Sequence, residues 1–319
     1  MTEGFTRAAS PVAAEDALRQ DLARGDAVIE SVAPVLRHLL SSEDHSVFRD
    51  EIVDATRGML SDLARQLLEG LSAEGNPADR NAELSAALVE RLVGEPELLG
   101  HAHALALEAQ LALRLEARLG LDPVVSPLLQ ALLASSDDHV SALAMGLVAA
   151  QARFVQNQRR MQLPLAELPG DLLHRILLAF RDVLSGMDVR QDAAERCEAD
   201  IRSAFDESRS RLGLLSRLVT GMGGGATAGL SLGHAGAAIF LTALSQASGE
   251  EREKVALIVS QEQLTRLALA LRAAGIKPDG IVQQLEILQP DARLQAYLEH
   301  LGTDQAATLL AQSALNRLG

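Results

Sequence analysis

Histidines that lie near carboxylates could take part in metal chemistry, because both residue types bind divalent metal ions. Glu97 and His101 are four residues apart, on one helix face, whereas His101 and His103 are two apart and fall on different faces. Asp137, Asp138 and His139 form a second polar cluster. A metal centre needs several converging ligands. Local spacing therefore predicts helix-end and capping residues and no metal site, with a site assembled between helices as the alternative.

Cys197, the single cysteine of the chain, is the candidate nucleophile. Its spacing from Ala194, Ile201 and Phe205 matches one helix face, which is typical of a core stripe. A reactive thiol needs an electropositive and accessible setting, and the neighbouring Glu198 opposes that. The pattern predicts a structural cysteine, and a lone cysteine excludes a disulfide within the chain.

His45 suits phosphotransfer, since acidic residues flank it in the segment EDHSVFRDEI. No kinase ATP-binding pattern follows it, and the proline typical of such histidine motifs is missing downstream. His174, within DLLHRILL, is interpreted as a partly buried helix residue and not as an acid–base catalyst. A histidine phosphorelay component is therefore kept only as an alternative function.

Glycines at 221 and 223 with Ala226 match a G-x-G-x-x-A spacing. A dinucleotide site requires a strand before these glycines, and the preceding residues follow a helical pattern instead. The chain contains no P-loop or zincin motif. The sequence thus predicts no catalytic residues, no cofactor-binding residues and no cofactor.

The same glycines belong to an uncharged segment, Gly221 to Leu244, in which Gly221, Gly225, Gly229 and Gly233 recur every four residues. We expect a flexible loop over the first five residues, because glycine disfavours helix, and a buried helix from about Leu230. Two alternatives remain: a tightly packed interface helix, and a membrane contact, which the hydroxyls and His234 disfavour.

The composition and net charge of the chain argue against several classes of protein. The chain has 319 residues, 48% of them hydrophobic and only 2% aromatic, and a net charge of −14. Abundant alanine and leucine favour helices over strands. The negative charge argues against binding nucleic acid or an anionic membrane surface. The first ten residues lack an apolar signal-peptide core, so we expect a cytoplasmic protein.

Helical periodicity and capping residues run through the chain. Ile52, Ala55, Met59, Leu63 and Leu67 form one face of a helix that we expect to open at Ser41 to Asp44 and to reach about Leu71. Further helix ends are predicted by a C-cap at Gly120, an N-cap and first-turn proline at Asp122-Pro123, and an N-cap cluster at Ser135 to Asp138.

Towards the C-terminus, two pairs have capping-box spacing: Ser248 with Glu251, and Ser260 with Gln263. The second precedes an apolar stripe that Gly275 is expected to end; the stripe consists of Leu264, Leu267, Ala268 and Leu271.

The predicted architecture is all-α: stacked antiparallel helix pairs in an irregular, HEAT-like array of two lobes. Leu163 to Gly170 contains two prolines and is the candidate boundary. This divides the chain into a flexible tail at 1–10, an N-terminal lobe at 11–162 and a C-terminal lobe at 163–319. Short connections favour antiparallel neighbours.

Two stretches resemble a known family: Asp122 to Phe180, above all RRMQLPLAELPGDLLH at Arg159 to His174, and His234 to Ile276, above all RLALALRAAGI at Arg266 to Ile276. Both are similar to the bacterial domain of unknown function 2336 family. The resemblance implies an all-helical bacterial protein, loosely HEAT-like in some members. It implies no activity, substrate, cofactor or functional residue.

These observations favour a non-enzymatic, helical protein-interaction module, a scaffold or regulator, because stacked helices offer extended grooves. The expected partner is a protein, with homo-oligomers possible and no membrane span. The alternatives are a ligand- or metal-binding helical enzyme that uses a pocket between helices, and the phosphorelay component based on His45.

Overall fold

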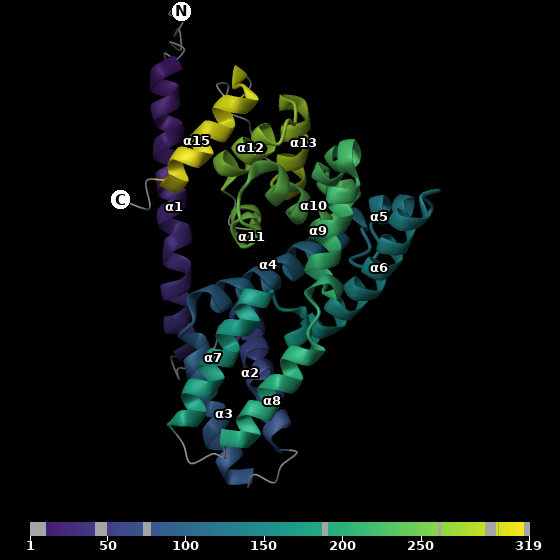
Figure 1. The fold of residues 1–319 in the computed structure, drawn as a ribbon. Helices are drawn as coiled ribbons and strands as arrows, with labels where there is room; N and C mark the ends of the chain where they lie inside the picture. Colours follow the sequence, from purple (N-terminus) through teal and green to yellow (C-terminus); the bar gives the residue numbers. More distant parts are fainter. Residues whose placement is uncertain are drawn as a thin grey trace, which may run out of the picture. The chain divides into compact units, whose positions relative to one another are not determined.

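Every element of the computed structural model is a helix over the residues that it describes, which are 11–41, 50–72, 78–186, 191–260, 263–290, 298 and 300–315 (Figure 1). None of these residues lies in a strand. The all-α prediction is confirmed for them. The predicted tail at 1–10 and His45 lie outside the described residues.

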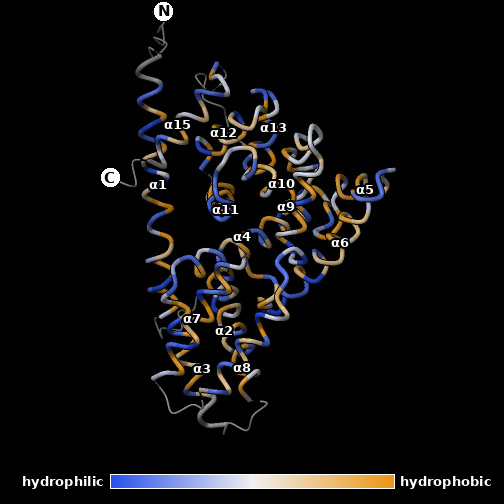
Figure 2. The backbone as a smooth tube through the Cα atoms, viewed as in Figure 1, coloured by the Kyte–Doolittle hydropathy of each residue, from blue (hydrophilic) through white to orange (hydrophobic). Residues whose placement is uncertain are grey.

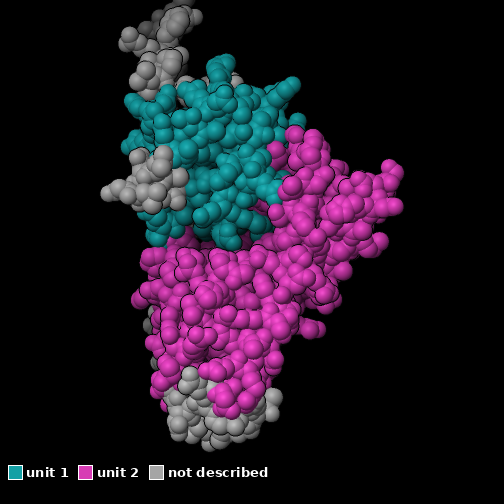
Figure 3. All heavy atoms as spheres, in the orientation of Figure 1, with its two compact units in different colours: residues 1–31, 243–319 teal, residues 32–242 magenta. Residues whose placement is uncertain are grey.

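The chain divides into two compact units (Figure 3). Unit 1 combines residues 1–31 with 243–319, and unit 2 contains residues 32–242. Unit 1 is therefore built from both ends of the chain. The Leu163–Gly170 segment, which the sequence suggested as a boundary, lies inside unit 2 between two of its helices.

Unit 2 contains the second part of α1 (Pro11–Ser41) and the helices that follow it. These are α2 (Glu51–Ser72), α3 (Ala78–Val93), α4 (Pro96–Leu119), α5 (Pro127–Leu133), α6 (Asp138–Arg159), α7 (Gly170–Ser185), α8 (Gln191–Ala204) and α9 (Arg211–Gly221), with 3-10 helices at η1 (Leu165–Glu167), η2 (Glu207–Arg209) and η3 (Gly223–Leu230).

The core of unit 2 forms around α2, which packs against α3, α4 and α8, while α7 packs against α3 and α8. Met59, Leu63 and Leu67 of the predicted stripe are completely buried. Each such side chain contributes about 1.5–3 kcal/mol through burial of apolar surface. Figure 2 shows hydrophobic and hydrophilic residues alternating along these amphipathic helices.

Of the helix ends predicted in unit 2, those at Gly120 and at Ser135 to Asp138 are confirmed. The helix start predicted at Ser41 to Asp44 is wrong, because Ser41 is the last residue of α1 and α2 begins at Glu51. Gly120 ends α4 with a φ of 67°, and Asp137 accepts hydrogen bonds from the first backbone N–H groups of α6. The N-cap and first-turn proline predicted at Asp122-Pro123 are wrong. Asp122 instead closes a turn on Val124 N, and α5 begins at Ser126-Pro127, where the Ser126 hydroxyl accepts from Leu129 N.

Unit 1 contains the first part of α1, the end of α10 (Leu232–Ser248), α11 (Arg252–Ser260), α12 (Leu264–Ala273), α13 (Pro278–Leu288) and α15 (Thr303–Leu315). α12 is central, because it packs against α11, α13 and α15. Leu267, Ala268 and Leu271 are buried along it, and Gly275 follows its end with a φ of 88°, as predicted.

Neither predicted capping box forms in unit 1. Ser248 and Ser260 are the last residues of α10 and α11, so each lies at the end of a helix and not at the start of the next. The Ser248 hydroxyl accepts from Glu250 N, whereas Gln263 precedes α12 without a side-chain cap. The spacing matched because serine also satisfies backbone groups at turns.

Gly221 is the last residue of α9 and Gly223–Leu230 forms a 3-10 helix, so the loop predicted over the first five residues of the glycine-rich segment is wrong. The buried helix, α10, begins at Leu232, close to its predicted start. Gly236 interrupts α10 with a φ of 72°, and a Cβ there would lie 3.1 Å from the Ser126 Cβ. Among the described helices, none alone has the length and apolar character of a membrane span. The pair Gly223–Leu230 and Leu232–Ser248, bent by 113°, passes that test together.

Candidate functional site

An open cavity of about 360 Å3 lies on unit 2 between α2, α4 and α6. Its lining is mainly apolar, and we call this surface the apolar groove. The side chains that define it are Ala55, Ala106, Ala109, Leu113, Val155 and Met161.

The floor of the apolar groove is one face of α4. Ala106, Ala109 and Leu113 lie three and four residues apart, so they follow each other along the helix. Seven residues of α-helix span about 10 Å. The floor is therefore an elongated strip, and its alanines make it shallow enough for another backbone to approach closely.

Two large apolar side chains of the groove face solvent. Leu113 is 55% exposed and Met161 is 42% exposed. Apolar side chains scattered singly over a surface are ordinary, whereas several that share one concave surface are typical of an interaction site.

Charged side chains line two sides of the apolar groove. Glu51 and Asp54 lie in the first turn of α2, and Arg159 is the last residue of α6. The groove therefore has an acidic α2 side and a basic α6 side.

Behind the groove, a buried ion pair connects α4 to α9. The Arg211 guanidinium donates to both carboxylate oxygens of Glu108, at 2.7 and 2.9 Å, and to the Gln151 amide oxygen at 3.2 Å. Its central carbon lies 3.7 Å from the centre of the Phe154 ring, which also lines the groove. Arg211 and Glu108 are 2% and 1% exposed. The adjoining cavity, about 20 Å3, has room for about one water molecule, so this pair is structural.

Hydrogen bonds between the backbone of the loop after α6 and side chains of α2 hold this loop on α2. Leu163 N donates to the Asp62 carboxylate at 3.0 Å, and Leu165 N donates to the Gln66 amide oxygen at 3.0 Å. The Gln66 amide nitrogen donates to Leu163 O at 2.9 Å. These bonds fix the chain beside Met161 and hence one edge of the groove.

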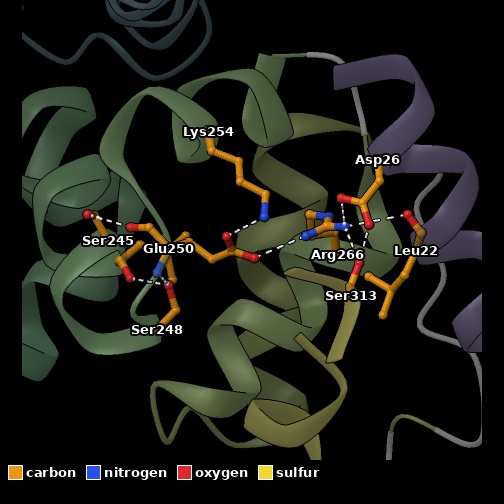
Figure 4. Close-up of polar contacts among 9 residues, drawn as sticks. Leu22, Asp26, Ser245, Ser248, Glu250, Lys254, Arg266 and Ser313 are labelled. Carbon is orange, nitrogen blue, oxygen red and sulfur yellow. Dashed lines mark hydrogen bonds and ion pairs between the residues drawn. The ribbon is translucent and has the colours of Figure 1, made fainter. Parts of the chain in front are cut away.

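A second charged cluster, in unit 1, surrounds Arg266 of α12 (Figure 4). The Arg266 guanidinium lies between two carboxylates: it donates to Asp26 of α1 and, at 3.0 Å, to Glu250. Lys254 lies 2.5 Å from the other Glu250 oxygen, and the Ser313 hydroxyl of α15 donates to Asp26. Arg266 is 2% exposed. We call this set the Arg266 cluster.

The Arg266 cluster joins segments far apart in sequence, since Arg266 and Asp26 are 240 positions apart. Opposite charges alternate along it, and each described member contacts its neighbour, as a buried ionic network requires. An open cavity of about 530 Å3 lies beside it between α1 and α15. Its contacts indicate that the cluster fastens α1 to α12 and α15 within unit 1.

The residues suggested for a metal site are not brought together. Glu97 forms an ion pair with Arg175 at 2.9 Å, and Asp138 and His139 are exposed at the start of α6. His101 and His103 are buried within α4, so their interpretation as helix-end residues is wrong. The described part of the chain contains no group of three or more His, Cys, Asp or Glu side chains that suits a metal ion.

His103 and Cys197 are buried titratable groups. Burial lowers the pKa of His103 from 6.5 to about 4, against a smaller opposing effect of the Asp50 charge. Burial, followed by the charges of Asp200 and Glu198, raises the pKa of the Cys197 thiol. Cys197 is 5% exposed and belongs to the core, and Ala194, Ile201 and Phe205 pack against that core, so the predicted core stripe is confirmed.

A scan against protein-family models, a search of curated proteins and a search of solved structures each found no match for this chain. The resemblance to the domain of unknown function 2336 family therefore stays a prediction.

Proposed function

We propose that the chain is a non-enzymatic helical protein-interaction module, a scaffold or regulator, and that the apolar groove is its docking surface. The observation that supports this is the groove itself. An elongated apolar strip on α4 is bordered by helices and by charges of both signs, with Leu113 and Met161 exposed on it. Interfaces commonly combine an apolar centre with a polar rim in this way.

The test compares proteins captured by three forms of the full chain from a lysate of its source organism. Leu113→Arg places a charge on the groove floor at a side chain already 55% exposed, so the fold is expected to tolerate it. Leu178→Arg is the matched control, because Leu178 of α7 is 42% exposed and does not line the groove.

We expect at least one protein to bind wild type and Leu178→Arg equally and to be lost with Leu113→Arg, measured by quantitative mass spectrometry. If the three forms capture the same proteins in the same amounts, the apolar groove is not a docking surface and the proposal is wrong.

A further inference from the structure

Met161 has a backbone conformation that favours glycine. Its φ is 53°, and it is the only described residue other than glycine with a positive φ. It follows α6, where Met161 N donates to Gln158 O at 3.0 Å and Gln162 N donates to Asn157 O at 2.8 Å. This pair of bonds closes many helices, and glycine usually occupies the left-handed position because it lacks a Cβ.

The surroundings hold this conformation in place. A Cβ on Gly58 would lie 2.4 Å from the Met161 Cβ, so the lack of a side chain at this position of α2 leaves room for the Met161 side chain. Asp62 and Gln66 fix the following loop on α2. Backbone geometry therefore favours glycine at 161, and yet a methionine is present with its side chain 42% exposed on the groove.

The floor of the apolar groove has a side-chain spacing that suits a helical partner. It extends along α4 through Ala106, Ala109 and Leu113, and the alanines let a second helix axis come near. An amphipathic helix places apolar side chains at the same three- and four-residue spacing. Methionine is flexible and polarisable, so it adapts to such side chains.

The charges at the two sides of the apolar groove indicate which charged residues a partner helix carries on its flanks. Glu51 and Asp54 on the α2 side attract a basic residue, and Arg159 on the α6 side attracts an acidic one. We propose that the apolar groove binds an amphipathic helix of a protein partner that has one basic and one acidic flank, with Met161 as a specificity-determining contact. This proposal rests on the proposed function of the groove and names the chemistry of its occupant.

A display library of helix-forming peptides of about 15 residues, near the shortest length that is stable alone, provides the probes. Peptides are selected on the full-length protein and counter-selected on Leu113→Arg. We expect the enriched sequences to share an apolar stripe with basic residues on one flank and acidic residues on the other. The proposal is overturned if the enriched peptides are extended or lack an apolar stripe. It is also overturned if no peptide is enriched on the wild-type protein relative to Leu113→Arg. A partner still lost with Leu113→Arg from lysate would then leave the docking function standing.

The best selected peptide, labelled with fluorescein, tests Met161 by fluorescence anisotropy. Met161→Ala and Met161→Gly should each weaken binding about fivefold to tenfold, whereas the control Leu178→Ala, which removes an equally exposed side chain outside the groove, should bind as wild type does. Asp54→Lys should weaken this peptide and favour one with glutamates on both flanks. Equal binding by Met161→Ala and wild type refutes the role of Met161.

Thermal melts of the same variants test the backbone argument. Met161→Gly should melt about 2–4 °C above Met161→Ala, because both lose the side chain and only alanine is disfavoured at this φ. An equal or higher melting temperature for Met161→Ala contradicts the inference that the side chain is kept against backbone preference. Dimerisation of wild type that Leu113→Arg abolishes, seen by sedimentation, would replace the partner helix with a second copy of this chain.

Discussion

The buried ion pair between Arg211 and Glu108 is predicted to make a large contribution to the stability of unit 2. Arg211→Met removes the guanidinium and leaves the Glu108 carboxylate, 1% exposed, without its bidentate partner. Removal of one member of a buried pair costs about 3–5 kcal/mol. The lost contact with the Phe154 ring adds about 1 kcal/mol, part of which the methionine side chain restores.

The double variant Glu108→Met/Arg211→Met should be much less destabilised than either single variant. Buried pairs replaced by apolar residues of similar volume are often neutral in stability. Gln151 loses its contact with Arg211 at 3.2 Å, which costs about 1 kcal/mol. We therefore expect the double variant within about 2 kcal/mol of wild type, with favourable coupling between the two residues of several kcal/mol.

Urea unfolding followed by far-ultraviolet circular dichroism measures these free energies. Arg217→Met is the control, because Arg217 is exposed and donates one hydrogen bond to Ser208 O, so its loss should cost no more than about 1 kcal/mol. If Arg211→Met costs less than about 1 kcal/mol, or if the two single effects simply add in the double variant, the electrostatic argument for this pair is refuted.

Three further predictions concern the packing of unit 2. His103 has a pKa of about 4 in the folded chain and near 6.5 in the unfolded chain, so the unfolded chain takes up the proton first as the pH falls. The free energy of unfolding should therefore decrease as the pH drops from 6.5 to 4. The loss is at most about 3 kcal/mol, and urea midpoints at pH 7 and pH 5 should show a smaller difference in His103→Gln than in wild type. Gly58→Ala should destabilise by about 1–3 kcal/mol, since its Cβ meets that of Met161; an unchanged melting temperature would contradict this contact. Gly70→Ala should also destabilise, because its Cβ would lie 2.4 Å from the Cys197 sulfur. Adding Cys197→Ala should relieve that clash, so additive effects in a double-mutant cycle would exclude it.

Local sequence determined most of the helices. Periodicity located the buried face of α2 at Met59, Leu63 and Leu67, and glycine chemistry located the helix ends at Gly120 and Gly275. Such predictions succeed because a helix and its caps depend on residues within a few positions of one another. The capping boxes at Ser248 and Ser260 failed because the same local hydrogen bonds also close turns after a helix.

The candidate site could not be predicted from the sequence. Ala106, Ala109 and Leu113 look like further core positions in a helix that is apolar nearly all round. Only the tertiary structure leaves that face open among the described residues of α2 and α6 and places Met161 beside it. The charged residues likewise gave no signal, since Arg211 and Glu108 are 103 positions apart and resemble ordinary surface residues.

The sequence by itself determined that this chain is helical, because alanine, leucine and the helix caps act over single turns. The tertiary structure decided which faces are covered. It joined the two ends of the chain in unit 1 through Arg266 and left an open apolar strip in unit 2. Whether a given alanine is core or surface depends on which helices pack against it, and that packing joins residues too distant in sequence for local spacing to reveal.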